Sequence, residues 1–354
     1  MDYVNLGKTG VKVSRICLGC MSYGVPPSGP LRPGSNAWSL NEEQSQPFFR
    51  QALDAGINFF DTANVYSTGD SERVLGRFLK ANAKREDTVI ATKLNGVMRD
   101  GPNGGGLSRK EIFFEIDESL RRLGTDYVDL YQIHRWDRTT PIEETLEALN
   151  DVVRAGKVRY LGASSMWAWQ FSKALYLADR HGWSRFVTMQ PHYNLLYREE
   201  EREMLPLCLD QGIGVLPWSP LAGGFLSGKY TRSGSTDDAA RRKKFDFPPV
   251  DKEKGYNIID VMREIAQRKG GTVAQMALSW LLHQPFVTSV IIGAKNEKQL
   301  QDNLGAVDLK LDAEELKKLD EVSRLSPEYP GWMFEFQGSD RAPGTVREWQ
   351  QYAK

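Results

Sequence analysis

The sequence predicts an α/β protein in which strands and helices alternate eight times, as in a (β/α)8 or TIM barrel. Eight short apolar segments are typical of buried strands, and each is followed by a segment with helical periodicity. Gly56, Gly156 and Gly212 precede strands and suit the ends of the preceding helices. Strands that alternate with helices of about 10–15 residues indicate a parallel sheet. Eight such units favour a closed barrel over an open doubly wound sheet, which is the alternative.

The predicted elements follow one another with little interruption. The strands are expected at residues 14–19, 57–60, 88–93, 127–134, 160–163, 186–190, 214–218 and 287–292. The helices that follow the second to eighth strands are expected at residues 71–80, 109–123, 142–155, 167–180, 199–211, 255–268 with 273–283, and 297–305. In the helix 109–123, Ser108 is the predicted N-cap and the apolar residues fall on one face.

The first helix, which ends near Ala55, has two possible starts. Ser39 and Glu42 resemble a capping box, which favours an early start. Pro47 fits a first turn better than a helix interior, which favours a start near Ser45.

Some of the chain lies outside the eightfold pattern. The loops 24–38 and 219–253 are long, and a further helix at 312–324 is followed by a tail over about 325–354. No tandem repeat or low-complexity linker divides the sequence, so residues 1–354 are predicted to form one domain.

The composition excludes several classes of protein. The 46 basic residues balance the 46 acidic residues, which does not indicate binding to nucleic acid. No apolar run approaches the roughly 20 residues of a membrane helix, and residues 1–19 lack the apolar region of a signal peptide. Three cysteines are too few for a disulfide framework. We therefore expect a cytoplasmic protein without a nucleic-acid or membrane partner.

Four polar residues lie at or just beyond the carboxyl ends of three neighbouring strands. Asp61 ends the second strand, Tyr66 lies in the loop after it, Lys93 ends the third strand and His134 ends the fourth. Barrel closure brings such strand ends together. An ammonium group beside a tyrosine favours the phenolate and lowers the tyrosine pKa, while a carboxylate keeps the ammonium charged. With a neutral histidine, this set suits protonation of a carbonyl oxygen while a hydride reaches its carbon.

The chain resembles the aldo-keto reductase superfamily over nearly its full length. The matching motifs, in order, are INFFDTANVYSTGDSERVLG at 57–76, ATK at 91–93, DLYQIHRWD at 129–137, GASS at 162–165, MQPHYNLL at 189–196, WSPLAGGFLSGKY at 218–230 and IIGAKNEKQLQDNLGA at 291–306. Within the superfamily, the chain resembles fungal and bacterial reductases of the versiconal hemiacetal acetate reductase-like kind. The resemblance implies a barrel that binds NADP(H), with Asp61, Tyr66, Lys93 and His134 as its catalytic tetrad. Reduction of an aldehyde or ketone is the implied activity, with an aromatic or polyketide-type substrate of secondary metabolism.

The resemblance also assigns cofactor contacts. Ser164, Ser165 and Gln190 correspond to positions that hold the nicotinamide carboxamide, and Trp218 to an aromatic that stacks on its ring. Lys295 stands where relatives often have Arg, and a cation there favours a 2′-phosphate and hence NADPH. The remaining implied contacts are Ser219, Pro220, Leu221, Gly223, Lys229, Gly293, Gln299, Asp302 and Asn303.

Aromatic residues are candidates for the substrate pocket. Trp136 is the leading one because it lies two residues after His134. The others are Tyr23, Trp167, Trp332 and Phe334. Core packing is the alternative role for each of them.

Three further features of the sequence and its resemblance allow other interpretations. The Cys17-x-x-Cys20 pair lacks the further ligands of a zinc site, so no metal is expected. Gly223–Lys229 nearly matches a P-loop, but Tyr230 replaces the required Ser or Thr. Some members of the superfamily serve as redox-sensing, NADP-binding subunits of ion channels, which is the alternative function.

Overall fold

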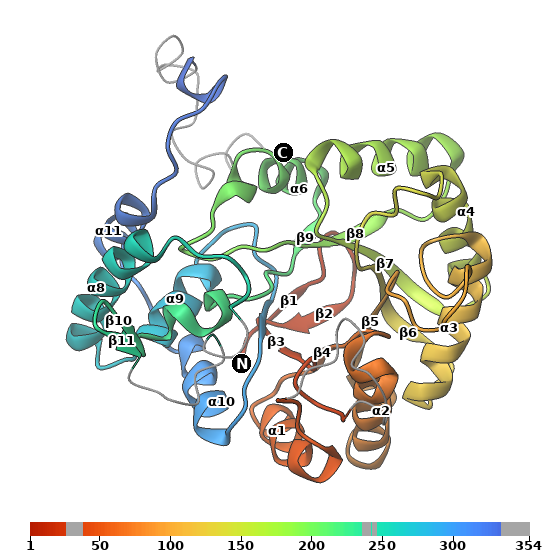
Figure 1. Cartoon of the computed structure of the whole chain (residues 1–354), viewed down its shortest axis with the longest axis horizontal. Coiled ribbons are helices and arrows are strands. Elements are labelled where there is room, and N and C mark those ends of the chain that lie inside the picture. The colour runs from red at the N-terminus through yellow and green to blue at the C-terminus, as the bar shows by residue number, and fades with distance from the viewer. Residues whose placement is uncertain (26–37, 236–241, 243–245, 334–354) are drawn as a thin grey trace. The chain divides into compact units, whose positions relative to one another are not determined.

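A computed structural model of the chain describes residues 1–25, 38–235, 242 and 246–333. The chain divides into two compact units, one of residues 1–190 with 291–301 and one of residues 191–290 with 302–354. Strands and helices alternate along the chain, as the colours of Figure 1 show. The single domain expected over residues 1–354 stays a prediction.

The first unit opens with an antiparallel hairpin that the sequence pattern did not reveal. β1 (Tyr3–Asn5) pairs with β2 (Lys12–Ser14), and β3 begins at Ile16. The predicted strand 14–19 is therefore wrong at its start, because Ser14 belongs to the hairpin. Strands of three residues are too short for their periodicity to stand out.

Parallel strands form the framework of the site. Six strands pair in parallel in chain order: β3 (Ile16–Gly19), β4 (Phe59–Asp61), β5 (Val89–Leu94), β6 (Val128–Ile133), β7 (Val158–Ser164) and β8 (Phe186–Gln190). The strand order of this sheet is β12-β3-β4-β5-β6-β7-β8, where β12 is Val290–Ile292, and β9 (Gly214–Val215) belongs to the second unit. These are the eight predicted strands, and the (β/α)8 class of α/β fold is confirmed.

Helices connect the strands of the first unit. They are α1 (Glu42–Asp54), α2 (Asp70–Asn82), α3 (Arg109–Leu123), α4 (Ile142–Arg154) and α5 (Ala168–His181). α3 has the predicted bounds: the Ser108 side chain accepts a hydrogen bond from the Glu111 N–H, and Gly124 ends the helix with left-handed backbone.

The start of α1 corrects both predictions made for it. Asn41 is the N-cap: its side chain accepts from the Gln44 N–H, and the Gln44 side chain accepts from the Asn41 N–H. This reciprocal pair satisfies two backbone donors and begins the helix at Glu42, so Pro47 lies inside it.

The second unit departs from prediction in the lengths of two elements. β9 ends at Val215 rather than at residue 218, because Pro217 cannot donate a ladder hydrogen bond. The predicted helix 199–211 is divided into η3 (Glu199–Glu201) and α6 (Met204–Gln211). The remaining elements are η4 (Ala222–Ser227), β10 (Tyr230–Thr231), β11 (Gly234–Ser235), α8 (Lys252–Lys269), α9 (Val273–Leu282), η5 (Gly305–Val307) and α11 (Ala313–Ser323), while α10 (Glu297–Leu304) follows β12.

Within the described ranges, no helix is both long and apolar enough to cross a membrane.

Candidate active site

Backbone hydrogen bonds extend the sheet beyond the ends of the strands that carry the predicted tetrad. The N–H groups of Thr62 and Asn64 donate to carbonyls of β5, at 2.9 and 3.1 Å. On the other side of β5, the His134 N–H donates to the Leu94 carbonyl at 2.9 Å. The loops after β4 and β6 are therefore held against β5, which carries Lys93.

Lys93 is fully buried and uses three acceptors. Its Nζ donates to Asp61 Oδ1 at 2.5 Å, to the Thr62 carbonyl at 2.9 Å and to the Tyr66 hydroxyl at 3.3 Å. An ammonium has three N–H donors, so this geometry accounts for all of them. Lys93 is therefore held in one orientation, between Asp61 and Tyr66.

Asp61 is held by two amide side chains that the sequence analysis missed in this role. Gln132 Nε2 and Gln190 Nε2 donate to Asp61 Oδ2 at 3.0 and 2.9 Å. Gln132 was not predicted at all, and Gln190 was predicted only as a cofactor ligand. Gln132 lies in a buried strand two residues before His134, and this buried amide was the signal that could have revealed it.

Gly162 makes room for this arrangement on β7. It lies opposite Gln132 in the register of β6 and β7. A Cβ at Gly162 would lie 2.9 Å from Gln132 Cγ and 2.4 Å from Thr188 Oγ1. A larger residue would therefore displace the amide that contacts Asp61.

Tyr66 begins η1 (Tyr66–Gly69), a short turn with unusual backbone angles. Ser67 and Thr68 have φ values of 48° and 51°, a region that non-glycine residues seldom adopt. The Tyr66 and His134 rings meet edge to face, with centroids 5.8 Å apart. The structure thus brings all four residues of the predicted tetrad together, and their catalytic role stays a prediction.

The charges in this group follow from burial and from Lys93. Burial lowers the pKa of Lys93, but Asp61 and Tyr66 outweigh that effect, so the pKa is raised and the ammonium stays charged. Burial, together with the charges of Lys93 and Arg135, holds the pKa of His134 well below 6.5. His134 is therefore neutral at neutral pH.

The expected effect of Lys93 on Tyr66 requires a correction. Lys93 does lower the pKa of Tyr66, but burial of the phenol raises it by more, so the net pKa is above its ordinary value of 10.0. Tyr66 is thus protonated at neutral pH.

The predicted cofactor residues of the first unit cluster in part. Ser164 Oγ donates to the Gln190 carbonyl at 2.9 Å and lies 3.1 Å from Ser165 Oγ. Ser165 has a φ of 51°. Residues 291–301, which include Gly293, also belong to the first unit. There the Lys295 N–H donates to Gln299 Oε1 at 3.0 Å. Lys295 Nζ lies 5.0 Å from the Trp38 ring centroid.

Within the second unit, Trp218 stacks on His192 and on Phe247, with centroids 4.6 and 6.0 Å apart. Ser219 Oγ accepts from the Gly223 N–H at 2.9 Å, which makes a tight turn that includes Pro220 and Leu221. The turn leads through Lys229 into β10 rather than into a helix, so the segment is not a P-loop.

Asp302 and Asn303, also in the second unit, belong to α10. The carboxylate of Asp302 accepts from Thr272 Oγ1 at 2.9 and 3.1 Å, and Asn303 is buried.

The substrate-pocket candidates differ in exposure. Tyr23 is fully buried against Phe48 and Phe49, which corrects its prediction: it packs in the core. Trp136 is half-buried beside Trp169, at 6.2 Å between ring centroids. Trp167 and Trp332 are exposed, and Phe334 lies outside the described residues.

Cys17 and Cys20 lie inside the first unit. Cys17 and Cys20 are buried free thiols, and burial raises the pKa of both well above 9.0. Over the part of the chain that the structure describes, no three His, Cys, Asp or Glu side chains are grouped to hold a metal ion.

Known proteins are similar to this chain over most of its length. The sequence profile of the aldo/keto reductase family matches residues 15–324. The chain is 40% identical over 350 residues to versiconal hemiacetal acetate reductase of Aspergillus parasiticus, covering 94% of this chain and 99% of that protein. It is 41% identical over 345 residues to a putative aryl-alcohol dehydrogenase of Schizosaccharomyces pombe, covering 90% and 95%. It is 39% identical over 350 residues to an aldo-keto reductase of Alternaria alternata, covering 92% of each. The chain belongs to the aldo-keto reductase family.

Proposed function

We propose that this protein is an NADPH-dependent reductase that converts an aldehyde or ketone to an alcohol. The observation that carries the proposal is the buried contact of Lys93 with both Asp61 and Tyr66. It pairs a neutral phenol, able to donate a proton, with a fixed cation that stabilises the phenolate left behind.

The residues beside this group suit a nicotinamide cofactor. Gln190 uses its amide nitrogen on Asp61, and its Oε1 has no hydrogen-bond donor within the described ranges. Gln190 Oε1 and the Ser164 hydroxyl therefore match the donor and acceptor groups of a carboxamide. The bound cofactor supplies the hydride.

Each of the four tetrad residues then has one role in the reaction. Tyr66 donates its proton to the carbonyl oxygen as the carbon receives the hydride, which gives the alcohol. Lys93 stabilises the resulting phenolate until solvent returns the proton, and Asp61 keeps Lys93 charged and in place. His134, which is neutral, orients the carbonyl oxygen by a hydrogen bond.

Further cofactor contacts are proposed from the family motifs alone. By their match to the family motifs, Trp218 would stack on the nicotinamide ring, and the turn with Ser219 and Gly223 would bind the pyrophosphate. Lys295 would pair with the 2′-phosphate, which favours NADPH over NADH.

We also propose an aromatic or polyketide-type substrate and a place in secondary metabolism. The names of two relatives, versiconal hemiacetal acetate reductase and aryl-alcohol dehydrogenase, support this class. Trp136 lies two residues beyond His134 and offers an aromatic face. A reducing, cytoplasmic setting is supported by the three buried free thiols.

The test is a spectrophotometric assay of NADPH oxidation with a panel of aromatic and aliphatic carbonyls, 4-nitrobenzaldehyde among them. Tyr66→Phe is expected to abolish turnover and to leave the Kd for NADPH nearly unchanged. Wild-type protein that binds NADPH but reduces no member of the panel would refute the proposal and favour the redox-sensing subunit. Full activity of Tyr66→Phe would show that Tyr66 is not the proton donor.

A further inference from the structure

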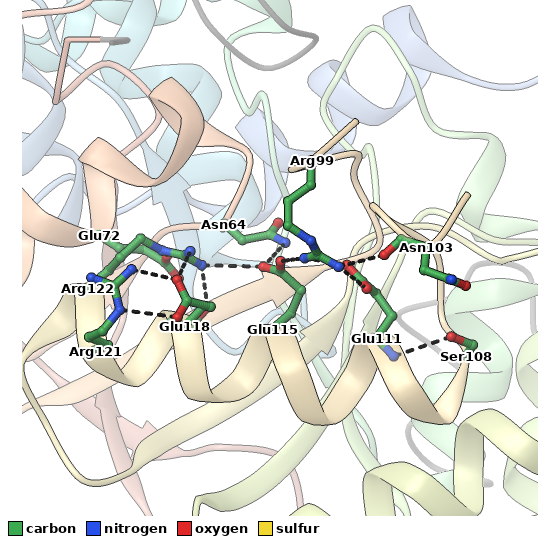
Figure 2. Close-up of polar contacts among 11 residues, drawn as sticks. Asn64, Glu72, Arg99, Asn103, Ser108, Glu111, Glu115, Glu118, Arg121 and Arg122 are labelled. Carbon is green, nitrogen blue, oxygen red and sulfur yellow. Dashed lines mark hydrogen bonds and ion pairs between the residues drawn. The ribbon is translucent and has the colours of Figure 1, made fainter. Parts of the chain in front are cut away.

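A largely buried network of charged side chains lies along α3, beside the segments that carry the predicted tetrad. We call Glu72, Arg99, Glu111, Glu115 and Arg122 the α3 network. Figure 2 shows Arg122 beside Glu72 and Glu115, and Arg99 between Glu111 and Glu115. The three carboxylates are at most 2% exposed, and the guanidinium of Arg122 is almost as well buried.

Close contact between two helices creates the centre of the network. A Cβ at Gly76 of α2 would lie only 2.1 Å from the Leu123 carbonyl oxygen of α3, so only glycine allows this approach. It places Arg122 Nε 2.5 Å from Glu72 Oε2. The same guanidinium donates from Nη2 to Ser119 Oγ at 3.1 Å and to Glu115 Oε2 at 3.4 Å.

Two hydrogen bonds join the network to the segments that carry Lys93 and Tyr66. Thr92 Oγ1 donates to Glu72 Oε1 at 2.5 Å, and Thr92 directly precedes Lys93 in β5. Because side chains alternate along a strand, Thr92 points to the opposite face of the sheet from Lys93. Asn64 Nδ2 donates to Glu115 Oε2 at 2.9 Å, and Asn64 lies two residues before Tyr66.

Arg122 also supports the strained turn that contains Tyr66. A Cβ at Gly69, the last residue of η1, would lie 2.5 Å from Arg122 Cδ. The left-handed backbone of Ser67 and Thr68 is strained and persists only where neighbouring contacts hold it. Arg122 packs against this turn at Gly69, and the Ser67 hydroxyl supplies another contact by donating to the Gly24 carbonyl at 2.8 Å.

Stabilisation of the fold does not by itself explain why this network is present. Removing Arg122 and three carboxylates from water carries a desolvation cost that ion pairing often only balances. The network nevertheless connects two catalytic segments, β5 and the loop after β4, to one helix. We propose that the α3 network is a positioning device that sets the distance between Lys93 and Tyr66. This inference rests on the proposed function.

The test compares two linking residues with a control residue that contacts the network at Arg122. Thr92→Val and Asn64→Ala each remove one link between the network and the catalytic segments. Ser119→Ala removes a buried partner of Arg122 that contacts neither segment. The two linking variants are expected to lower kcat about tenfold or more, since small misplacements are costly to catalysis, with KM changed less than about threefold. Ser119→Ala is expected to keep kcat within about twofold.

Two further readouts separate positioning from folding. Thr92→Ser, which keeps the hydroxyl, is expected to restore the wild-type kcat. In Thr92→Val and Asn64→Ala, the alkaline limb of the kcat profile is expected to move to higher pH, because a more distant Lys93 stabilises the phenolate less. Besides Lys93, the groups that act on the Tyr66 charge are Asp61 and Arg135, and these stay in place.

The outcomes are distinct from those of the proposed function. An inactive wild-type protein refutes the reductase proposal. An active wild type with unchanged kcat in both linking variants overturns the positioning role. The positioning role is also overturned if all three variants lose kcat in proportion to the unfolding free energy that each has lost.

Discussion

The Lys93 ammonium and the Asp61 carboxylate lie 2.5 Å apart, with neither side chain more than 3% exposed. Such a pair is held together by the absence of water, because each charge would be strongly unfavourable if the other were removed. Gln132 and Gln190 satisfy the second oxygen of Asp61, so the pair belongs to a hydrogen-bonded group rather than standing alone.

Asp61→Asn is expected to destabilise the fold by about 3–5 kcal/mol, because it leaves the buried ammonium without its counter-charge. It should also lower kcat by at least about tenfold. Urea unfolding and initial rates measure the two effects. The control is Arg77→Gln, which breaks the exposed pair with Glu42 and is expected to change stability by less than about 1 kcal/mol. Equal losses in the two variants would contradict the importance given to burial.

Substitutions of Gln132 should show that Asp61 needs its amide donors. Gln132→Leu removes one hydrogen bond to Asp61 and is expected to cost about 1–3 kcal/mol, with a moderate loss of kcat. Gln132→Glu puts a second carboxylate beside Asp61 and is expected to cost more. Denaturant titrations rank the stabilities of wild type, Gln132→Leu and Gln132→Glu. A Gln132→Glu variant as stable as wild type would be incompatible with the observed contact between Gln132 and Asp61.

The stability of the protein should fall below pH 6.5 in part because of His134. Its folded-state pKa lies well below 6.5, so the unfolded chain binds more protons as the pH falls through that value. Stability from this group is fully present above the unfolded pKa and is lost as the pH falls towards the folded pKa. His192, whose pKa is lowered to about 4 by burial, acts in the same direction.

The unfolding free energies of wild type and His134→Gln are measured at about pH 7.5 and about pH 5.5, which lie on either side of the ordinary histidine pKa. The difference in unfolding free energy between the two conditions should be smaller in His134→Gln. An identical difference would mean that His134 has the same pKa in the folded and unfolded chains.

Gly76→Ala should be destabilising although alanine favours helices by up to about 1 kcal/mol. The added Cβ would lie 2.1 Å from the Leu123 carbonyl oxygen, so α2 and α3 must separate. We expect a loss above about 2 kcal/mol and a lower kcat, because Glu72 and Arg122 would move apart. Gly10→Ala is the control, since nothing lies within 4 Å of its added Cβ. Thermal unfolding of both variants provides the comparison.

Lys295→Ala tests the proposed preference for NADPH. Loss of the cation is expected to weaken NADPH binding about tenfold or more and to leave NADH binding nearly unchanged, because only NADPH carries the 2′-phosphate. Fluorescence titration with each cofactor measures the two Kd values. The same change for both cofactors would remove Lys295 from the proposed 2′-phosphate site.

The sequence by itself determined the order of the eight parallel strands and of the helices between them, and it supplied the four residues of the predicted tetrad. Helix 109–123 was predicted to the residue, because its cap at Ser108 and its apolar face are encoded within about four turns. The tetrad could be identified because each member lies at or just after a strand end, within a motif that resembles one family.

Only the tertiary structure decided which partners these residues have. Gln190 reaches Asp61 across 129 positions of the chain, and Arg122 reaches Glu72 across 50. No local pattern encodes such pairs, because they depend on how closely two backbones approach, as at Gly76 and Leu123. The net direction of the Tyr66 pKa was undetermined for the same reason: Lys93 and burial act oppositely on it, and burial exists only in the folded chain.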